Sequence, residues 1–188
     1  MSEKYLQDHR FEGLRTVEEL EPYIGGNFEN CQLYGADFTD SKFFDCSFDN
    51  CDLSLSVLKS CVLQEVTFKG CKIMGVHFED CNAFALALSF PECKLDNSSF
   101  WGLKLPSLKM EACSLQGVDF TEAQLEKAIF NGSDCRNAKF DHTNLKNADF
   151  RGAFHYTIQP DLNNIRGAKF NLAGLPGLLS VYNIKVEE

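Results

Sequence analysis

The sequence predicts an all-β solenoid, a rod in which the backbone coils with four short sides to each turn. The main observation is a five-residue period, because nearly every fifth residue from Phe28 to Phe150 is Phe, Leu or a similar apolar residue. A period of five fits neither the 3.6-residue repeat of an α-helix nor the alternation of a simple strand. It requires a chain that turns a corner every five residues, and repetition at a fixed period is typical of solenoids.

A second period, of twenty residues, sets the number of sides. Cysteines recur two places before the central apolar residue with spacings of 20, 20, 22 and 20, at Cys31, Cys51, Cys71, Cys93 and Cys113. The central residues form four series with this longer period, which predicts a four-sided turn. The first and second series are Phe28, Phe48, Phe68, Phe90, Met110, Phe130 and Phe150, and Leu33, Leu53, Ile73, Leu95 and Leu115. The third and fourth are Phe38, Leu58, Phe78, Phe100, Phe120 and Phe140, and Phe43, Leu63, Ala83, Leu105, Leu125 and Leu145.

Each five-residue side is expected to bury two residues and expose three. The central residue and the small residue two places before it would point inward, into a core too narrow for two Phe-sized groups per side. Successive turns would stack at about 4.8 Å with strand-like hydrogen bonds, so that like side chains form ladders. One break in phase, two extra residues between Ala83 and Phe90, predicts a bulge or short loop at residues 84–89.

The chain divides into a central coil and two ends. We expect an N-terminal cap over residues 1–25, the coil over residues 26–155, and a terminal coil with a C-terminal cap over residues 156–188. Thr16 and Glu19 have the spacing of a capping box that opens a short helix through Leu20. Pro176 suits the first turn of a second short helix, which would run to about Tyr182.

The C-terminal segment is too apolar for a free end. One interpretation is a cap that covers the last turn of its own chain, and the other is a cap that also forms a twofold dimer interface. The residues expected at this interface are Leu175, Leu178, Leu179, Tyr182 and Ile184.

Composition places the chain among soluble intracellular proteins. Its first 25 residues are charged and lack an apolar core, so no signal peptide is expected, and no stretch reaches membrane-spanning length. Of its nine cysteines, eight occupy the small inward position and Cys135 occupies a central one. Such a pattern indicates buried, reduced thiols, and we expect a cytoplasmic location.

The sequence carries no pattern typical of an enzyme. Its four histidines, His9, His77, His142 and His155, lack the spacing of a metal site. The pair Gly25 and Gly26 is an isolated turn signal rather than a phosphate-binding loop. We therefore expect neither catalytic activity nor a metal or other cofactor.

Charge is unevenly distributed over the four sides. The net charge is −9, and the third side carries seven acidic residues against Lys59 and Lys139. These acids, which we call the acidic stripe, are Asp37, Asp40, Glu79, Asp80, Asp119, Glu122 and Asp141. The stripe is either a solvated face that aids solubility or a surface for a basic partner. No side is strongly positive, so direct binding of nucleic acid is not expected.

The repeated blocks resemble those of the pentapeptide repeat family. Examples are Ala-Asp-Phe-Thr-Asp at residues 36–40 and Ala-Asp-Phe-Arg-Gly at residues 148–152. Within the family the chain looks like the branch that contains the Qnr quinolone-resistance proteins, MfpA and the microcin B17 immunity protein. The supporting features are a single rod of this length, the phase break, residues 130–135 and the apolar tail at 183–186.

The resemblance implies both a fold and a function. It implies a right-handed quadrilateral β-helix, a homodimer joined at the C-terminal ends, and a surface that mimics DNA. The implied partner is a type II topoisomerase, DNA gyrase or topoisomerase IV, which the chain would modulate or protect from quinolones or a peptide toxin. A protein-interaction scaffold with a different partner remains the alternative.

Overall fold

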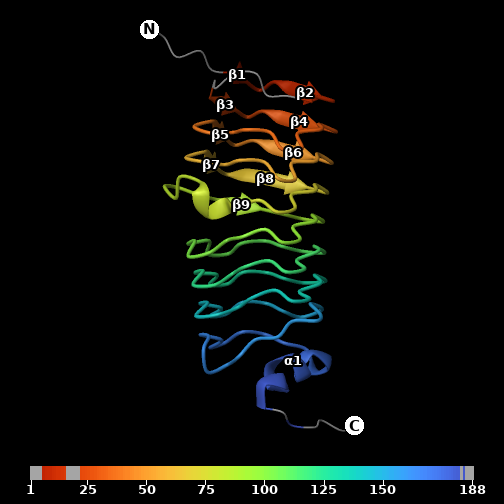
Figure 1. Ribbon diagram of the computed structural model, residues 1–188, viewed down its shortest axis with the longest axis vertical. Coiled ribbons are helices and arrows are strands. Elements are labelled where there is room, and N and C mark those ends of the chain that lie inside the picture. Colours follow the sequence, from red (N-terminus) through yellow and green to blue (C-terminus); the bar gives the residue numbers. More distant parts are fainter. Residues whose placement is uncertain (1–5, 16–21, 183, 185–188) are drawn as a thin grey trace.

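The computed structural model of the chain describes residues 6–15, 22–182 and 184. The backbone forms a single rod of stacked coils, with the N-terminus at one end and the C-terminus at the other (Figure 1). Two parallel sheets form two sides of its N-terminal half. One contains β1 (Leu6–Gln7), β3 (Tyr23–Ile24), β5 (Lys42–Phe44) and β7 (Val62–Gln64). The other contains β2 (Arg10–Glu12), β4 (Asn27–Glu29), β6 (Ser47–Asp49), β8 (Val66–Lys69) and β9 (Leu88–Ser89).

The register of these strands follows the twenty-residue period. Phe28 lies opposite Phe48, and Phe48 lies opposite Phe68. Single parallel bridges continue the stacking along the rest of the rod, as between Asp119 and Lys139. The predicted all-β solenoid is therefore confirmed, and its turns bond to one another mainly through backbone groups twenty residues apart.

Aromatic ladders fill the interior. On the first side, the ring centroids of Phe28 and Phe48 lie 4.5 Å apart with nearly parallel planes. Rings on adjacent sides meet edge to face, as Phe120 and Phe130 do at 5.8 Å and 79°. Both arrangements are favourable for aromatic rings. The central residues therefore pack along the rod axis and also across it.

The small inward residues contribute hydrogen bonds as well as fitting the narrow core. The Cys71 thiol donates to the carbonyl of Phe48 at 3.2 Å, and the Cys93 thiol donates to that of Phe68 at 3.2 Å. The hydroxyl of Ser98 makes the equivalent bond at 2.6 Å. All nine cysteines are buried and unbridged. Burial raises the pKa of Cys61 to about 12, so this thiol stays protonated at neutral pH.

The corners combine a tight turn with an Asx hydrogen bond. The N–H of Ala36 donates to the carbonyl of Leu33 at 3.1 Å, and Gly35 between them has a φ of 66°. A positive φ at this turn position is best accommodated by glycine or asparagine. On the next side, Asp37 Oδ1 accepts the backbone N–H of Thr39 at 2.9 Å. The Asp or Asn before the central residue thus holds the backbone as it approaches the corner.

The break in phase differs in detail from the predicted loop at residues 84–89, because residues 88 and 89 already form the strand β9. A 3-10 helix, η1 (Phe78–Asp80), precedes the break, and the pairing of Val66 with Leu88 shows that the register has moved to 22 residues. The loop between η1 and β9 projects from the side of the rod (Figure 1). Ala83 was expected to point inward, and this was wrong, because Ala83 is exposed and Leu86 packs against the core instead. A leucine fills an internal gap that an alanine would leave partly empty.

The coil continues into both predicted end segments. Phe11 is half-buried, and its ring stacks on Phe28 at 4.7 Å. At the other end, the ring of Phe170 stacks on Phe150 at 5.3 Å. The predicted capping box at Thr16 and Glu19 lies outside the described residues.

The predicted C-terminal helix is present. The last segment comprises η2 (Leu172–Gly174), α1 (Pro176–Leu179) and η3 (Ser180–Tyr182). Proline stands in the first turn of α1, as expected. This segment lies across the end of the rod (Figure 1).

Candidate partner-binding surface

The structure places all seven acids of the acidic stripe on the outer surface of the third side. Five are exposed, namely Asp37, Asp40, Asp80, Glu122 and Asp141, while Glu79 and Asp119 are half-buried. The parallel bridges align the side: Asp37 pairs with Val57, and two turns further on Ser99 pairs with Asp119. The acids therefore lie along one face of the rod.

Some of these acids also stabilise the coil. Asp119 accepts the backbone N–H of Thr121 at 2.9 Å, and its other oxygen lies 3.3 Å from the ammonium group of Lys139. Partial burial acts to raise the pKa of Asp119, but these bonds outweigh it, and the pKa lies below its usual value. Hydrogen bonds from Thr39 likewise lower the pKa of Asp37. Both groups remain charged at neutral pH.

Other acids of the stripe are exposed and take no part in holding the coil together. Asp40, Asp80 and Glu122 all occupy the second position after a central residue, at the corner that leads to the fourth side. Within the described part of the chain, their side chains make no hydrogen bond or ion pair. Two other acids of the stripe have a histidine beside them, since His77 Nδ1 lies 2.9 Å from Glu79 and His142 Nδ1 lies 2.9 Å from Asp141.

The predicted interface residues at the C-terminus have different environments. Leu175, Tyr182 and Ile184 are exposed, Leu179 is half-buried, and Leu178 is buried with 8% of its surface accessible. Leu178 therefore covers the end of its own core. Leu172, which is not among the residues predicted for the interface, is 83% exposed and extends the apolar surface of this segment.

Side chains suited to metal binding do not cluster. In the described ranges, no group of three or more His, Cys, Asp or Glu side chains could hold a metal ion. His155 illustrates the usual arrangement, since its Nδ1 lies 2.8 Å from Asp134 in an exposed pair. Such pairs on a solvated surface contribute little to stability.

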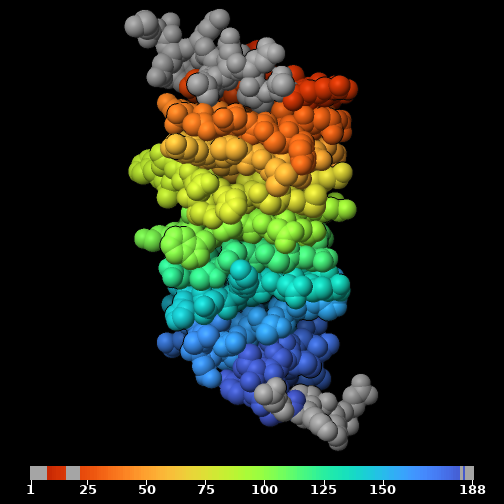
Figure 2. Space-filling model, in the orientation of Figure 1, coloured from red at the N-terminus to blue at the C-terminus, as the bar shows by residue number. Residues whose placement is uncertain are grey.

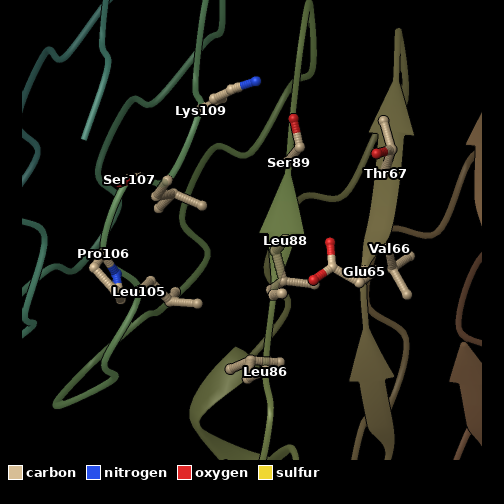
Figure 3. A pocket seen from close by; sticks show the side chains of 12 residues that line it. Glu65, Val66, Thr67, Leu86, Leu88, Ser89, Leu105, Pro106, Ser107 and Lys109 are labelled. Carbon is tan, nitrogen blue, oxygen red and sulfur yellow. The ribbon is translucent and has the colours of Figure 1, made fainter. Parts of the chain in front are cut away.

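A groove that the sequence does not predict lies beside the phase break (Figure 3). It lies where three successive turns meet, with Leu86, Leu88 and Leu105 among its apolar lining and Glu65 and Lys109 among its polar lining. The projecting loop opens it, because the two extra residues move the backbone out of the regular stack.

Two exposed aromatic residues near the phase break were missed as well. Phe84 is 83% exposed and Trp101 is 51% exposed. Their signal in the sequence is their position, because both fall outside the inward series while the third and fourth sides are otherwise mainly polar outside. Exposed large apolar residues that gather on one surface commonly mark interaction sites.

The four-sided coil and its repeated corners are typical of a repeat protein with a five-residue period. The model of the pentapeptide repeat region matches residues 26–88 and 72–150. The chain belongs to the pentapeptide repeat family. No curated protein sequence matches it.

Solved structures share the fold at low sequence identity. One is a trypsin-treated variant of QnrB1, described as a plasmid-mediated fluoroquinolone resistance protein, with a TM-score of 0.73 and 16% identity over 98% of this chain and 92% of that one. Another is a second trypsin-treated QnrB1 variant, with a TM-score of 0.65 and 16% identity over 97% of each chain. This likeness concerns the fold. Across the described residues, the structure contains no helix of the length and apolarity needed to span a bilayer.

Proposed function

We propose that this protein binds a type II topoisomerase, DNA gyrase or topoisomerase IV, through the acidic stripe. Binding would modulate the enzyme or protect it from quinolones or a peptide toxin. The observation that carries this proposal is the stripe itself, a line of exposed and half-buried carboxylates on one side of the rod. A topoisomerase surface that normally contacts DNA phosphates is basic, and such a surface is complementary to this side. The fold shared with QnrB1, a fluoroquinolone resistance protein, also supports this proposal.

The proposed form of the protein is a cytoplasmic homodimer joined at its C-terminal ends. Leu175, Tyr182 and Ile184 are exposed beside the last turn, and a twofold axis there would cover the same patch on both copies. Two rods joined end to end would present a longer acidic surface than one. No catalytic step is proposed, because the activity would lie in the partner.

The proposal can be tested with purified gyrase. DNA supercoiling should be measured across a range of protein concentrations, with and without ciprofloxacin, and binding should be measured at several salt concentrations. The informative variant changes Asp40, Asp80 and Glu122 together to Lys. These three corner residues are exposed and bear no structural bond in the described chain, unlike Asp119, whose reversal would also disturb its turn.

A matched control reverses three acids at equivalent corner positions on other sides. Asp45, Glu65 and Glu92 are exposed, and their φ values of 53°, 55° and 61° match the corner conformation of Asp40 and Glu122, while Asp80 lies in η1. The parent and this control should bind gyrase, with an affinity that falls as salt rises, while the stripe variant should bind weakly and lose any effect on the enzyme. Equal binding by both variants would refute the stripe as the surface. A parent that leaves gyrase unbound at every salt concentration would favour a scaffold for a different partner.

A further inference from the structure

We infer that the acidic stripe binds its partner around an apolar anchor, formed by Trp101 and Phe84. The matching surface on the partner is an apolar pocket edged by Lys or Arg side chains, and not a basic surface alone. This inference rests on the proposed function, because it describes how the same side of the rod recognises a topoisomerase. It adds a contact that DNA, with its phosphate backbone, does not provide.

Trp101 lies within the stripe, between two acidic turns. The chain has a single tryptophan, and half of its surface is exposed. The pairing of His77 with Ser99, and of Ser99 with Asp119, aligns Trp101 with Glu79 in the preceding turn and with Thr121 in the following one. Its own side, residues 98–102, reads Ser-Ser-Phe-Trp-Gly and has no charge. An uncharged, aromatic stretch thus interrupts the stripe at mid-rod.

Phe84 is the second exposed aromatic residue of this region. It belongs to the loop that leaves the rod just after η1, one turn before Trp101 and beyond the same corner. Asn82 Oδ1 accepts the N–H of Phe84 at 2.9 Å, and Ala85 has a φ of 56°, so a defined turn presents the ring. Residues 83–87 read Ala-Phe-Ala-Leu-Ala and have no charge. The yellow-green segment that contains them protrudes from one edge of the rod (Figure 2).

The charges around these residues define the partner. Asp80 lies in the turn before Trp101 and Glu122 in the turn after it, and both are exposed. Lys104 is the nearest base along the chain, and it lies past the corner on the fourth side. Protein interfaces typically have an apolar centre with aromatic side chains and a polar rim, and Trp is frequent among the residues that contribute most affinity. Acidic residues in the rim are complementary to basic residues on the partner.

The single tryptophan allows a direct test. The chain can be produced with 5-fluorotryptophan, which gives one fluorine resonance from Trp101, and then titrated with unlabelled gyrase. We expect the resonance to shift at stoichiometric gyrase, since broadening alone reports only the slower tumbling of the complex. A resonance that keeps its chemical shift while the chain binds gyrase would overturn the anchor.

Affinity measurements on variants complete the test. Trp101→Ala should weaken gyrase binding about thirtyfold, the size of effect typical of a central aromatic anchor, and adding Phe84→Ala should weaken it further. The matched control is Tyr34→Ala, because Tyr34 is 66% exposed and has the same repeat position on the second side. That control should bind like the parent. Phe84 and Tyr34 are mostly exposed, so their replacement should leave the melting temperature unchanged, while Trp101→Ala, at a half-exposed side chain, should stay folded at the temperature of the binding assay.

The outcomes separate the two proposals. If the reversal of Asp40, Asp80 and Glu122 abolishes binding while the two aromatic changes leave it intact, the stripe is the surface and the anchor is wrong. If both sets weaken binding, and the aromatic contribution persists at high salt where the charges are screened, both proposals are supported. If the parent does not bind gyrase, the proposed function fails and the anchor fails with it.

Discussion

Ser133 donates its hydroxyl hydrogen to the carbonyl of Met110 at 2.6 Å and accepts the N–H of Cys113 at 2.9 Å. Cys71 occupies the same position three turns earlier and makes the same two contacts. Its thiol donates to the carbonyl of Phe48 at 3.2 Å and accepts the N–H of Cys51 at 3.4 Å. On this ladder Ser133 and Cys71 are therefore interchangeable in their hydrogen bonds, and this explains why a compact side chain that can both donate and accept recurs there.

We predict that Ser133→Ala destabilises the coil while Ser133→Cys is nearly neutral. The alanine leaves a buried carbonyl and a buried N–H without their partner, which costs about 1–3 kcal/mol. The cysteine restores both contacts, as Cys71 shows. The free energy of unfolding from denaturant titrations would measure this difference. Equal losses for the two variants would mean that the position selects size alone.

Phe120→Ala should cost about 3–5 kcal/mol of stability, as expected for a buried Phe truncated to Ala. Phe120 is fully buried, and its ring lies 5.5 Å from that of Phe100 and 5.1 Å from that of Phe140. Glu122→Ala on the same side is the control, and it should change stability by less than about 0.5 kcal/mol because Glu122 is exposed. A loss below about 1 kcal/mol for Phe120→Ala would contradict the ladder as a source of stability.

The period-based predictions succeeded because stacking imposes them on every turn. Each inward residue must align with the one twenty residues away, so the spacing of Phe28, Phe48 and Phe68 predicts the fold. The phase break follows no such period. Whether Ala83 or Leu86 packs against the core there depends on the local fit of the side chain, which the period does not predict. Outward positions are free of packing constraints, so the period places Trp101 outside the core but does not predict which surface it belongs to.

Acid should destabilise the coil in part through Asp149. Its hydrogen bonds with Arg151, whose Nη2 lies 2.7 Å from Oδ2, hold the pKa of Asp149 below its usual value. A lowered pKa stabilises the folded state fully above the unfolded-state value of about 4, and this contribution disappears as the pH falls through the folded-state value. The parent should therefore lose more stability than Asp149→Asn between about pH 5 and pH 3. Parallel pH profiles of unfolding free energy would argue against this contribution.

The thiols should be inert in the folded protein. Burial raises the pKa of Cys61 to about 12 and, with smaller opposing hydrogen bonds, that of Cys113 to about 11. The thiolate is the reactive form, and the core excludes the reagent as well. A dithiobisnitrobenzoate assay at about pH 8 should detect almost no thiol before unfolding and all nine afterwards. Rapid reaction of the folded chain would show that a ladder cysteine is accessible.

The proposed dimer can be tested without disturbing the cap. Leu178 is buried against its own chain, so replacing it with a charge would unfold the end of the rod and obscure the result. Leu175 and Ile184 are 37% and 53% exposed, and they suit the purpose better. Changing both to Asp would place four carboxylates in a twofold interface, where burial without partners is strongly unfavourable.

The parent should therefore have the mass of a dimer in light scattering, and Leu175→Asp with Ile184→Asp should have the mass of a monomer with the same melting temperature. Leu55→Asp with Val57→Asp is the control, since these residues are 52% and 46% exposed and lie far from the C-terminal end. That control should stay dimeric. If the C-terminal variant remains a dimer, the contact lies elsewhere. If the parent is itself a monomer, the exposed leucines of this segment serve only as the outer surface of a cap.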